Sequence, residues 1–161
     1  MAWDADCLYF AFEVTDDVHV NPSRDARVWE GDMIQIELVP GGPPEKSSDP
    51  TMRQFAIACD DEGPFMFQWN MLAEDGAALV NGVQKSCRIA CAKGENGNVT
   101  YEAAVPWKAL QLKPPKANSR FGFSFVVSDN DQNDMKGWLQ LTPGIFGEHN
   151  PAAIGWLILR Q

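Results

Sequence analysis

Apolar and polar residues alternate along most of this chain, which is the pattern of half-buried β-strands. In residues 8–14 the apolar side chains fall at every second position, and residues 55–59 and 121–127 repeat this arrangement. Because successive side chains of a strand point to opposite faces, each segment would bury one face in a core. Further segments that we expect to be strands lie at residues 65–69, 84–92, 99–105, 137–141 and 154–159.

Segments rich in proline, glycine and asparagine separate the predicted strands, at residues 40–50, 93–98, 113–119 and 142–151. Only residues 106–112 indicate a short helix, because they begin with a proline, which suits the first turn. Many short strands and almost no helix predict an all-β fold, an antiparallel two-sheet β-sandwich of the jelly-roll or immunoglobulin-like kind. A chain of 161 residues is long enough for one such domain with a complete core.

The charge of the chain limits the classes of partner. The formal net charge is −9, and no run of Lys or Arg is available to neutralise phosphates. We therefore expect no nucleic acid and no anionic membrane as a partner. No apolar run approaches the roughly 20 residues of a membrane-spanning helix. Residues 1–10 lack the basic start and apolar centre of a signal peptide, so any export signal would lie outside this chain.

The four cysteines, Cys7, Cys59, Cys87 and Cys91, do not have the spacing of a zinc-binding motif. Cys87 and Cys91 are four positions apart in a predicted strand and so share one face. Burial as small apolar side chains is the expected state, because a disulfide requires two close Cα atoms. A pairing across strands is the alternative, and the disulfide state does not follow from the sequence.

Residues 28–38 (VWEGDMIQIEL) combine an aromatic side chain with a polar strand face. Trp29 precedes the strand, in which three aliphatic residues alternate with Gln35 and Glu37. The aliphatic residues would face the core, and the two polar residues would face the opposite side. An aromatic ring beside such groups is typical of sugar binding, because a pyranose offers apolar C–H faces and hydroxyls. The alternative is a core tryptophan that closes one end of the sandwich.

Four segments, taken in order, resemble the family 9 carbohydrate-binding modules, and the resemblance covers nearly all of the chain. A glycine followed by apolar residues at 154–159 matches the last strand of that family. The resemblance implies a single sandwich domain over residues 1–161 that binds carbohydrate without catalysis. It also implies an accessory module of a larger polysaccharide-acting protein. The four segments are residues 3–17 (WDADCLYFAFEVTDD), 28–38 (VWEGDMIQIEL), 99–110 (VTYEAAVPWKAL) and 121–131 (FGFSFVVSDND).

The resemblance also implies a location and a ligand. Members belong to secreted or cell-surface proteins, so the expected location is extracellular or at the cell surface. The expected ligand is a plant-type β-glycan such as cellulose or xylan, or the end of its chain. Members usually begin with one or two strands before the Trp-Asp segment, and the chain is expected to lack these, which would leave the strand at residues 8–14 partly uncovered and prone to association.

In the family, two tryptophans hold the terminal sugar, and polar side chains bind its hydroxyls. Trp29 matches the first tryptophan, Gln35 matches a hydroxyl-binding acidic residue, and Arg53 lies near a family arginine. The loop that should supply the second tryptophan contains Phe146 and His149 instead. These departures from the family pattern affect the pair of tryptophans that clamps the sugar, and they do not affect the fold.

A second aromatic residue could take part in the site. Trp138 and Gln140 share one face of a predicted strand, and Leu139 and Leu141 share the other. If the leucines are core residues, Trp138 offers a platform that partly replaces the missing clamp. The alternative is a tryptophan packed beneath the neighbouring loop. Together with the residues above, the predicted carbohydrate-binding set is Trp29, Gln35, Glu37, Arg53, Trp138, Gln140, Phe146 and His149.

An acidic turn at residues 128–137 offers a set of oxygen ligands, namely Asp129, Asn130, Asp131 and Asp134. Ca²⁺ takes 6 to 8 such ligands, and the resemblance implies structural calcium in the family. A solvated acidic turn is the alternative, since the segment lacks the EF-hand pattern. Asp16 and Asp17, and the run Asp60, Asp61 and Glu62, are weaker metal candidates, for which surface charge is the alternative.

Catalysis is not expected. Glu30 and Asp32 are two positions apart, whereas the carboxylates of a glycosidase flank the scissile bond at about 5 to 9 Å. The chain has two histidines and no nucleophile elbow. A binding function without chemistry is therefore predicted, and the alternative is a structural or protein-interaction sandwich that has lost the sugar site.

Overall fold

The chain forms an all-β domain in the computed structural model, which describes residues 1–44, 51–72, 79–95, 97–131, 134–147 and 150–160. Two short 3₁₀ turns, η1 (Val28–Glu30) and η2 (Pro151–Ala153), interrupt the strands. None of the described residues forms a helix that is long and apolar enough to cross a membrane. The strands are β1 (Ala2–Trp3), β2 (Cys7–Thr15), β3 (Met33–Pro40), β4 (Arg53–Asp60), β5 (Gly63–Leu72), β6 (Leu79–Val83), β7 (Arg88–Lys93), β8 (Asn98–Pro106), β9 (Arg120–Asp131), β10 (Asp134–Gln140) and β11 (Gly155–Ile158).

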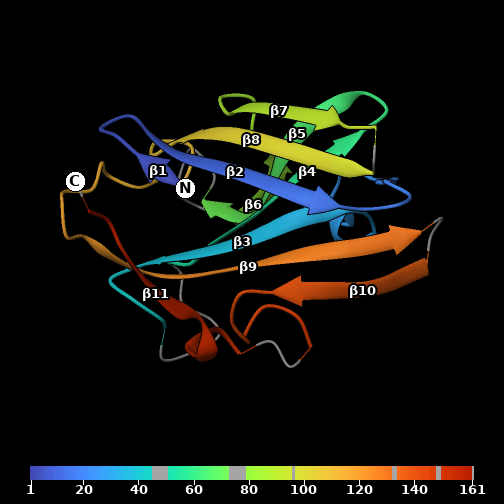
Figure 1. The fold of residues 1–161 in the computed structure, drawn as a ribbon. Helices are drawn as coiled ribbons and strands as arrows, with labels where there is room; N and C mark the ends of the chain where they lie inside the picture. The colour runs from blue at the N-terminus through green and yellow to red at the C-terminus, as the bar shows by residue number, and fades with distance from the viewer. Residues whose placement is uncertain (45–50, 73–78, 96, 132–133, 148–149, 161) are drawn as a thin grey trace.

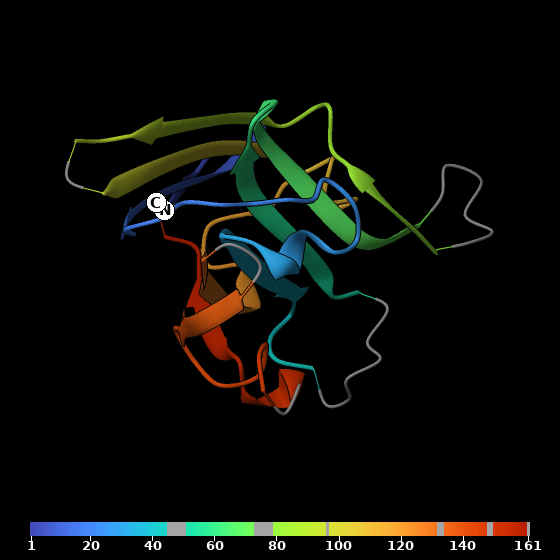
Figure 2. The same cartoon turned by 90° about the vertical axis from the view of Figure 1, so that its right-hand side faces the viewer.

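The strands form two antiparallel sheets that pack face to face (Figures 1 and 2). The smaller sheet has the order β1-β2-β8-β7, and the larger has the order β10-β9-β3-β4-β5-β6. The long strand β9 pairs with β11 along its first part and with β10 along its second part. This arrangement confirms the predicted antiparallel two-sheet sandwich.

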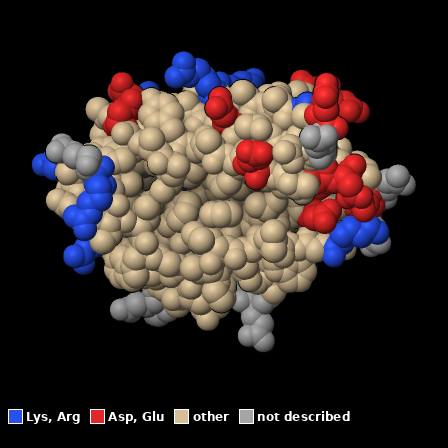
Figure 3. Space-filling view, in the orientation of Figure 1, with Lys and Arg blue, Asp and Glu red and all other residues tan. Residues whose placement is uncertain are grey.

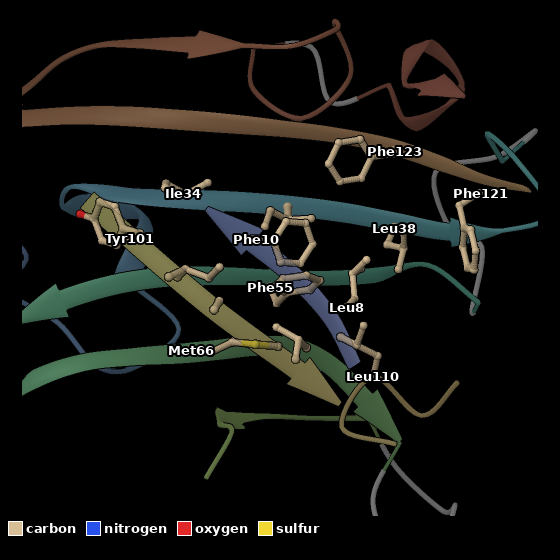
Figure 4. Packing of buried hydrophobic residues seen from close by; sticks show 14 of the residues in the cluster. Leu8, Phe10, Ile34, Leu38, Phe55, Met66, Tyr101, Leu110, Phe121 and Phe123 are labelled. Carbon is tan, nitrogen blue, oxygen red and sulfur yellow. The ribbon is translucent and has the colours of Figure 1, made fainter. Parts of the chain in front are cut away.

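The core lies between the two sheets and contains the alternating apolar residues. Figure 4 shows side chains of both sheets meeting there, with Phe10 of β2 facing Phe55 of β4 and Phe123 of β9. The ring centroids of Phe10 are 6.0 Å from Phe55 and 6.4 Å from Phe123. Aromatic rings at such separations interact favourably in addition to burying apolar area. The period-two pattern of residues 8–14, 55–59 and 121–127 therefore faces the core as predicted.

The short helix predicted at residues 106–112 is wrong, because this segment forms consecutive turns. Pro106 is the last residue of β8, opposite Cys7 of β2, so it does not begin a helix. Trp107 and Leu110 are both buried in the core, which pulls the turns tightly against the sandwich. Gln111 then adopts a left-handed backbone with φ of 53°, which ends the segment.

The strand predicted at residues 84–92 begins later than expected. Strand β7 starts at Arg88, and a separate strand, β6, pairs with β5 before it. The backbone N–H of Gln84 still donates to the carbonyl of Met66 at 2.8 Å, after which the chain crosses to the smaller sheet. The apolar alternation therefore continues across a connection between the two sheets.

Gly122 of β9 marks a close approach between two chain segments, and its replacement by alanine should destabilise the fold. A Cβ atom there would lie 2.7 Å from the backbone nitrogen of Pro43 and 2.8 Å from the carbonyl carbon of Gly42. Backbone atoms cannot move aside cheaply, so Gly122→Ala should lower the free energy of unfolding by about 1–3 kcal/mol. Chemical denaturation measures this change.

Gly137 of β10 is the matched control for that substitution. A Cβ atom at Gly137 meets no other atom within 4 Å. Gly137→Ala should therefore change the free energy of unfolding by about 0.5 kcal/mol or less. Equal effects of the two substitutions would contradict the close approach at Gly122.

Candidate functional site

The outer face of the larger sheet, which points away from the core, carries a row of polar side chains at its centre. Gln35 of β3 pairs with Ala56 of β4 and with Val126 of β9. The adjacent outward position of β4 is Gln54, which lies opposite Glu37. Since both neighbours of Gln35 have small or short side chains, its amide lies in a depression of the sheet surface.

The loop between β2 and β3 places Trp29 above this face. Turn η1 is anchored by Val28, which is fully buried, and by a 3.0 Å hydrogen bond from the Val28 N–H to the carbonyl of Asp25. Trp29 follows the buried residue and is 44% exposed. The alternative of a core tryptophan is therefore wrong for Trp29, and its ring is available to a ligand.

A second hydrophobic cluster lies outside the sandwich, beneath this loop. It contains Val28, Met33, Ala56, Ala58, Phe65 and Phe67, with Trp69 and Phe146 packed against it. Trp69 Nε1 donates to the carbonyl of Ala26 at 3.1 Å, and the ring of Trp69 contacts Phe67 at a centroid distance of 5.3 Å. These contacts fix the loop that carries Trp29 to β5. A site on a loop held in this way is preorganised for binding.

Phe146 comes from the loop after β10, the position at which the resemblance requires a second aromatic residue. Its ring lies 5.7 Å from the ring of Trp138, and it packs against the outer cluster. Trp138 thus supports Phe146 from the neighbouring strand. Trp138 itself is 46% exposed, so it is not packed fully beneath the loop.

These elements enclose a shallow hollow of about 310 Å³ on the outer face. Trp29, Trp69 and Phe146 supply aromatic walls, and Gln35 and Gln54 supply amide groups. Gln35 is only 5% exposed, and its side-chain amide forms no hydrogen bond with another described residue. Buried amides are normally paired in proteins, so an unpaired amide in an open hollow is suited to a ligand's hydroxyl groups.

The structure brings together three of the eight predicted carbohydrate-binding residues in this hollow, Trp29, Gln35 and Phe146. Glu37 lies on the same face but is fully buried, and it accepts a 3.3 Å hydrogen bond from Gln54 Nε2. Gln140 also lies on this face, opposite Val126, with a buried Oε1 that has no partner among the described residues. His149 lies outside the described residues.

Arg53 is separated from the hollow, because its side chain points to the opposite side of the larger sheet. It pairs with the core residue Leu38 across the ladder, and its Nε donates to the carbonyl of Leu110 at 2.6 Å. Alternation along β4 therefore places Gln54, and not Arg53, in the hollow. Trp138 was expected to offer a platform for a sugar if Leu139 and Leu141 were core residues. This condition is not met, since Leu139 is 77% exposed and is not a core residue.

Sequence reasoning missed Gln54 and Trp69 as members of the site. Trp69 has no polar neighbours on its own strand face that would mark it as a site residue, and the structure shows that it has both a packing contact and a place on the wall of the hollow. Both residues reach Gln35 only because β4 and β5 follow β3 in the sheet. The one signal in the sequence was the alternation Phe65, Phe67, Trp69, which places the three rings on one face.

The four predicted calcium ligands lie in a paired hairpin of β9 and β10, in which Asp134 is opposite Asp131. Asn130 is buried, and its Nδ2 donates to the carbonyl of Glu30. Asp129, which precedes Asn130, instead lines a cleft between the sheets. Since Asp129 and Asn130 are neighbouring strand residues, their side chains point to opposite faces of the hairpin. The calcium site stays a prediction.

Acidic side chains gather at the end of the molecule where β2 and β9 end, as Figure 3 shows. Burial raises the pKa of Asp129, and the nearby charges of Asp131 and Asp16 raise it further. Burial raises the pKa of Asp32 to about 7, although N–H groups of Val20 and Asn130 donate to its carboxylate and oppose this shift. This end of the sandwich therefore concentrates negative charge that solvent only partly stabilises.

The cysteines lie mostly in or against the core and are free thiols. Cys7 is buried, and the other three pack against the main core. Burial raises the pKa of Cys87 to about 11, so this thiol is protonated at neutral pH. The expected burial is therefore complete only for Cys7, and Cys59, Cys87 and Cys91 are half-buried.

A two-sheet sandwich with an aromatic-walled hollow on an outer sheet face defines a β-sandwich module of the ligand-binding class. The full chain, residues 1–161, matches the family described as "Carbohydrate family 9 binding domain-like". The chain belongs to this family, and the resemblance noted in the sequence is thereby confirmed.

Two solved structures show the same fold. Both are of a family 9 carbohydrate-binding module from Caldicellulosiruptor kristjanssonii, one in complex with glucose and one in complex with cellotriose. The glucose complex has a TM-score of 0.67 at 17% identity, with 98% of this chain and 73% of that chain covered. The cellotriose complex has a TM-score of 0.68 at 17% identity, with 98% and 71% covered. Among the curated proteins, none matches this sequence.

Proposed function

We propose that the hollow on the outer face binds a sugar residue of a β-linked glycan, without catalysis. The observation that carries the proposal is the combination, in one hollow, of the exposed Trp29 ring with the Gln35 amide, which has no hydrogen-bond partner among the described residues. The ring suits the apolar face of a pyranose, and the amide suits its hydroxyls. Membership of the family supports this function, and the glucose and cellotriose in the two related structures support a glucose-based ligand.

The binding mode differs from a clamp of two tryptophans. Phe146 lines the hollow where the resemblance leads us to expect the second tryptophan, and Trp69, which is held by its hydrogen bond to Ala26, adds a third aromatic wall. A phenylalanine covers less of a sugar ring than a tryptophan and has no N–H to donate. We infer weaker binding of a single sugar than a two-tryptophan clamp would give.

The biological setting is proposed from the family. Such a module would act as the accessory part of a larger secreted or cell-surface protein that acts on polysaccharides, and would hold that protein on cellulose or xylan. The glucose units of cellulose carry a hydroxymethyl group at C5, and the xylose units of xylan lack it. The preference of the hollow for one glycan over the other therefore depends on whether it contacts this group. The direct test is a calorimetric titration of the domain with cellotriose and with xylotriose.

The second candidate function, a protein-interaction sandwich, is favoured by one observation. Trp156, Leu139 and Leu141 are exposed by 62%, 77% and 53%. If neither oligosaccharide nor a glycan array gives binding, this second function replaces the first.

Phe146→Ala tests the role of the replaced clamp position. The substitution should weaken cellotriose binding by about three- to tenfold, because it removes one aromatic wall worth about 1 kcal/mol. Titration calorimetry with cellotriose measures the change. Phe146→Trp is the matched variant, and it should strengthen binding if the hollow has the geometry of a clamp. Equal affinity in all three proteins would exclude Phe146 from the site.

A further inference from the structure

Three side chains converge between the sheets at the acidic end of the sandwich, in a place that the sugar site does not use. Asp16, His19 and Asp32 offer ligand atoms that all lie within 4.8 Å of one another. His19 Nδ1 lies 3.2 Å from Asp16 Oδ2 and 3.7 Å from Asp32 Oδ2. The side chains of Asp16, His19 and Asp32 are only 7%, 5% and 4% exposed.

The orientation of His19 is set by a group outside the trio. Its Nε2 lies 3.3 Å from the carbonyl oxygen of Cys59, which accepts a hydrogen bond from the tautomer that carries its hydrogen on Nε2. In the neutral ring, Nδ1 then presents a lone pair to two carboxylates. A metal-binding histidine has the same arrangement, in which the second ring nitrogen donates to a backbone carbonyl.

Both carboxylates are also held by the backbone. Asp16 Oδ1 accepts a 3.1 Å hydrogen bond from Val18 N–H, and the Asp16 N–H donates to the carbonyl of Gly97 at 2.8 Å. Asp32 accepts hydrogen bonds from the N–H groups of Val20 and Asn130. The three ligand atoms thus face one another because separate elements fix them there.

The charge of the trio is not balanced by a permanent cation. Within the described part of the chain, the basic side chain paired with Asp16 and Asp32 is that of His19, which is charged only when protonated. Asp129 lines the same cleft, of about 290 Å³, and adds further negative charge. Buried carboxylates require a partner, and a bound cation would supply it.

The geometry and the ligand types select the kind of cation. Ligands at about 2.1 Å from one tetrahedral ion lie about 3.4 Å apart, which falls between the 3.2 Å and 3.7 Å separations found here. One imidazole nitrogen with two carboxylates suits Zn²⁺ and its first-row neighbours, whereas Ca²⁺ and Mg²⁺ favour oxygen ligands throughout. The cleft beside the trio leaves room for water as a further ligand.

We propose that Asp16, His19 and Asp32 form a binding site for a divalent transition-metal ion of the Zn²⁺ type. The ion joins the end of β2 to the start of β3 and so stabilises the intervening loop, which carries Trp29. The site is distinct from the sugar hollow, and its existence does not depend on the proposed sugar binding.

The experiment compares metal ions on the whole domain after dialysis against EDTA. Zinc chloride at about 100 times its Kd should raise the melting temperature by about 5–10 °C, because an ion that binds only the folded state stabilises it by mass action. Calcium chloride at the same concentration is the comparison and should give less than a third of this shift. A melting temperature indifferent to zinc overturns the proposal.

The variant His19→Gln tests the assigned ligand, and Asp17→Asn is its matched control. His19→Gln should lower zinc affinity by at least about 100-fold, because it removes the imidazole ligand. Asp17→Asn removes a charge next to the trio but outside it, and should change zinc affinity by less than about threefold. Equal zinc responses of His19→Gln and the unsubstituted domain overturn the proposal, since the ion would then bind elsewhere, for example at the thiols.

A nitrogen-15 NMR measurement on the unsubstituted domain tests whether zinc binds to His19, even if His19→Gln does not fold. The chain has two histidines, so the imidazole signals are few and simple to assign. Zinc should shift the Nδ1 signal of His19 while its Nε2 keeps the hydrogen. An unchanged His19 signal at saturating zinc overturns the proposal.

Discussion

Trp29→Ala should lower the affinity of the domain for cellotriose by about tenfold or more while the fold persists. The Trp29 ring is 44% exposed at the edge of the hollow, so it can stack on a sugar that enters there. Such stacking, together with the apolar area that it buries, is worth about 1–2 kcal/mol, which corresponds to the expected loss. Titration calorimetry with cellotriose measures the affinity, and a melting curve measures the fold.

Trp156→Ala is the matched control for this substitution. Trp156 is also an exposed tryptophan on the outer face of the larger sheet, opposite Gly122, but it does not line the hollow. Its replacement should leave cellotriose affinity within about twofold. If Trp29→Ala and Trp156→Ala change the affinity equally, sugar binding does not depend on the hollow. If Trp29→Ala costs as much stability as a core substitution, the ring has a structural role instead.

Trp107→Ala should lower the free energy of unfolding by about 3–5 kcal/mol, which is the cost of truncating a large core aromatic. Trp107 is 1% exposed, stacks on Phe121 at 6.2 Å, and donates from Nε1 to the carbonyl of Asp4 at 3.0 Å. The substitution leaves a cavity and an unpaired carbonyl. Urea denaturation followed by tryptophan fluorescence or circular dichroism measures the loss.

Trp107→Phe separates the two causes of that loss. It keeps an aromatic ring against Phe121 and removes the hydrogen bond to Asp4, so it should cost about 1–3 kcal/mol. A change below 1 kcal/mol for Trp107→Ala would show that the turns at residues 107–111 contribute little to stability. The burial of Trp107 would then not explain why these residues form turns instead of a helix.

The site was only partly predictable from the sequence, as Gln35 and Arg53 show. Gln35 alternates with aliphatic residues inside one strand, so its face followed from the local pattern alone, and the structure places it in the hollow. Arg53 lies next to a proline-rich loop that hides where the strand begins. A shift of one residue reverses the face of every side chain in a strand, and Gln54 accordingly takes the position expected for Arg53.

The proposed metal ligands also could not be predicted from the local sequence pattern. Asp16, His19 and Asp32 lie in one stretch of 17 residues, yet no spacing rule selects them, because the loop between them is irregular. Their meeting depends on the carbonyl of Cys59, in a different strand, and on N–H groups of Val20 and Asn130. Such contacts form only when the two sheets have packed.

The sequence by itself determined the features that depend on local periodicity: the β-sandwich class, the core face of most strands, and the polar face beside Trp29. Period two along a strand is a property of neighbouring residues, so it can be read without knowing the fold. The tertiary structure alone decided which strands lie side by side, and thus that Gln54 and Trp69 join Gln35 in one hollow. It also decided that residues 107–111 turn rather than form a helix, because the burial of Trp107 and Leu110 outweighs a weak local preference. Strand order and loop paths result from contacts between residues far apart in the chain, which no local pattern encodes.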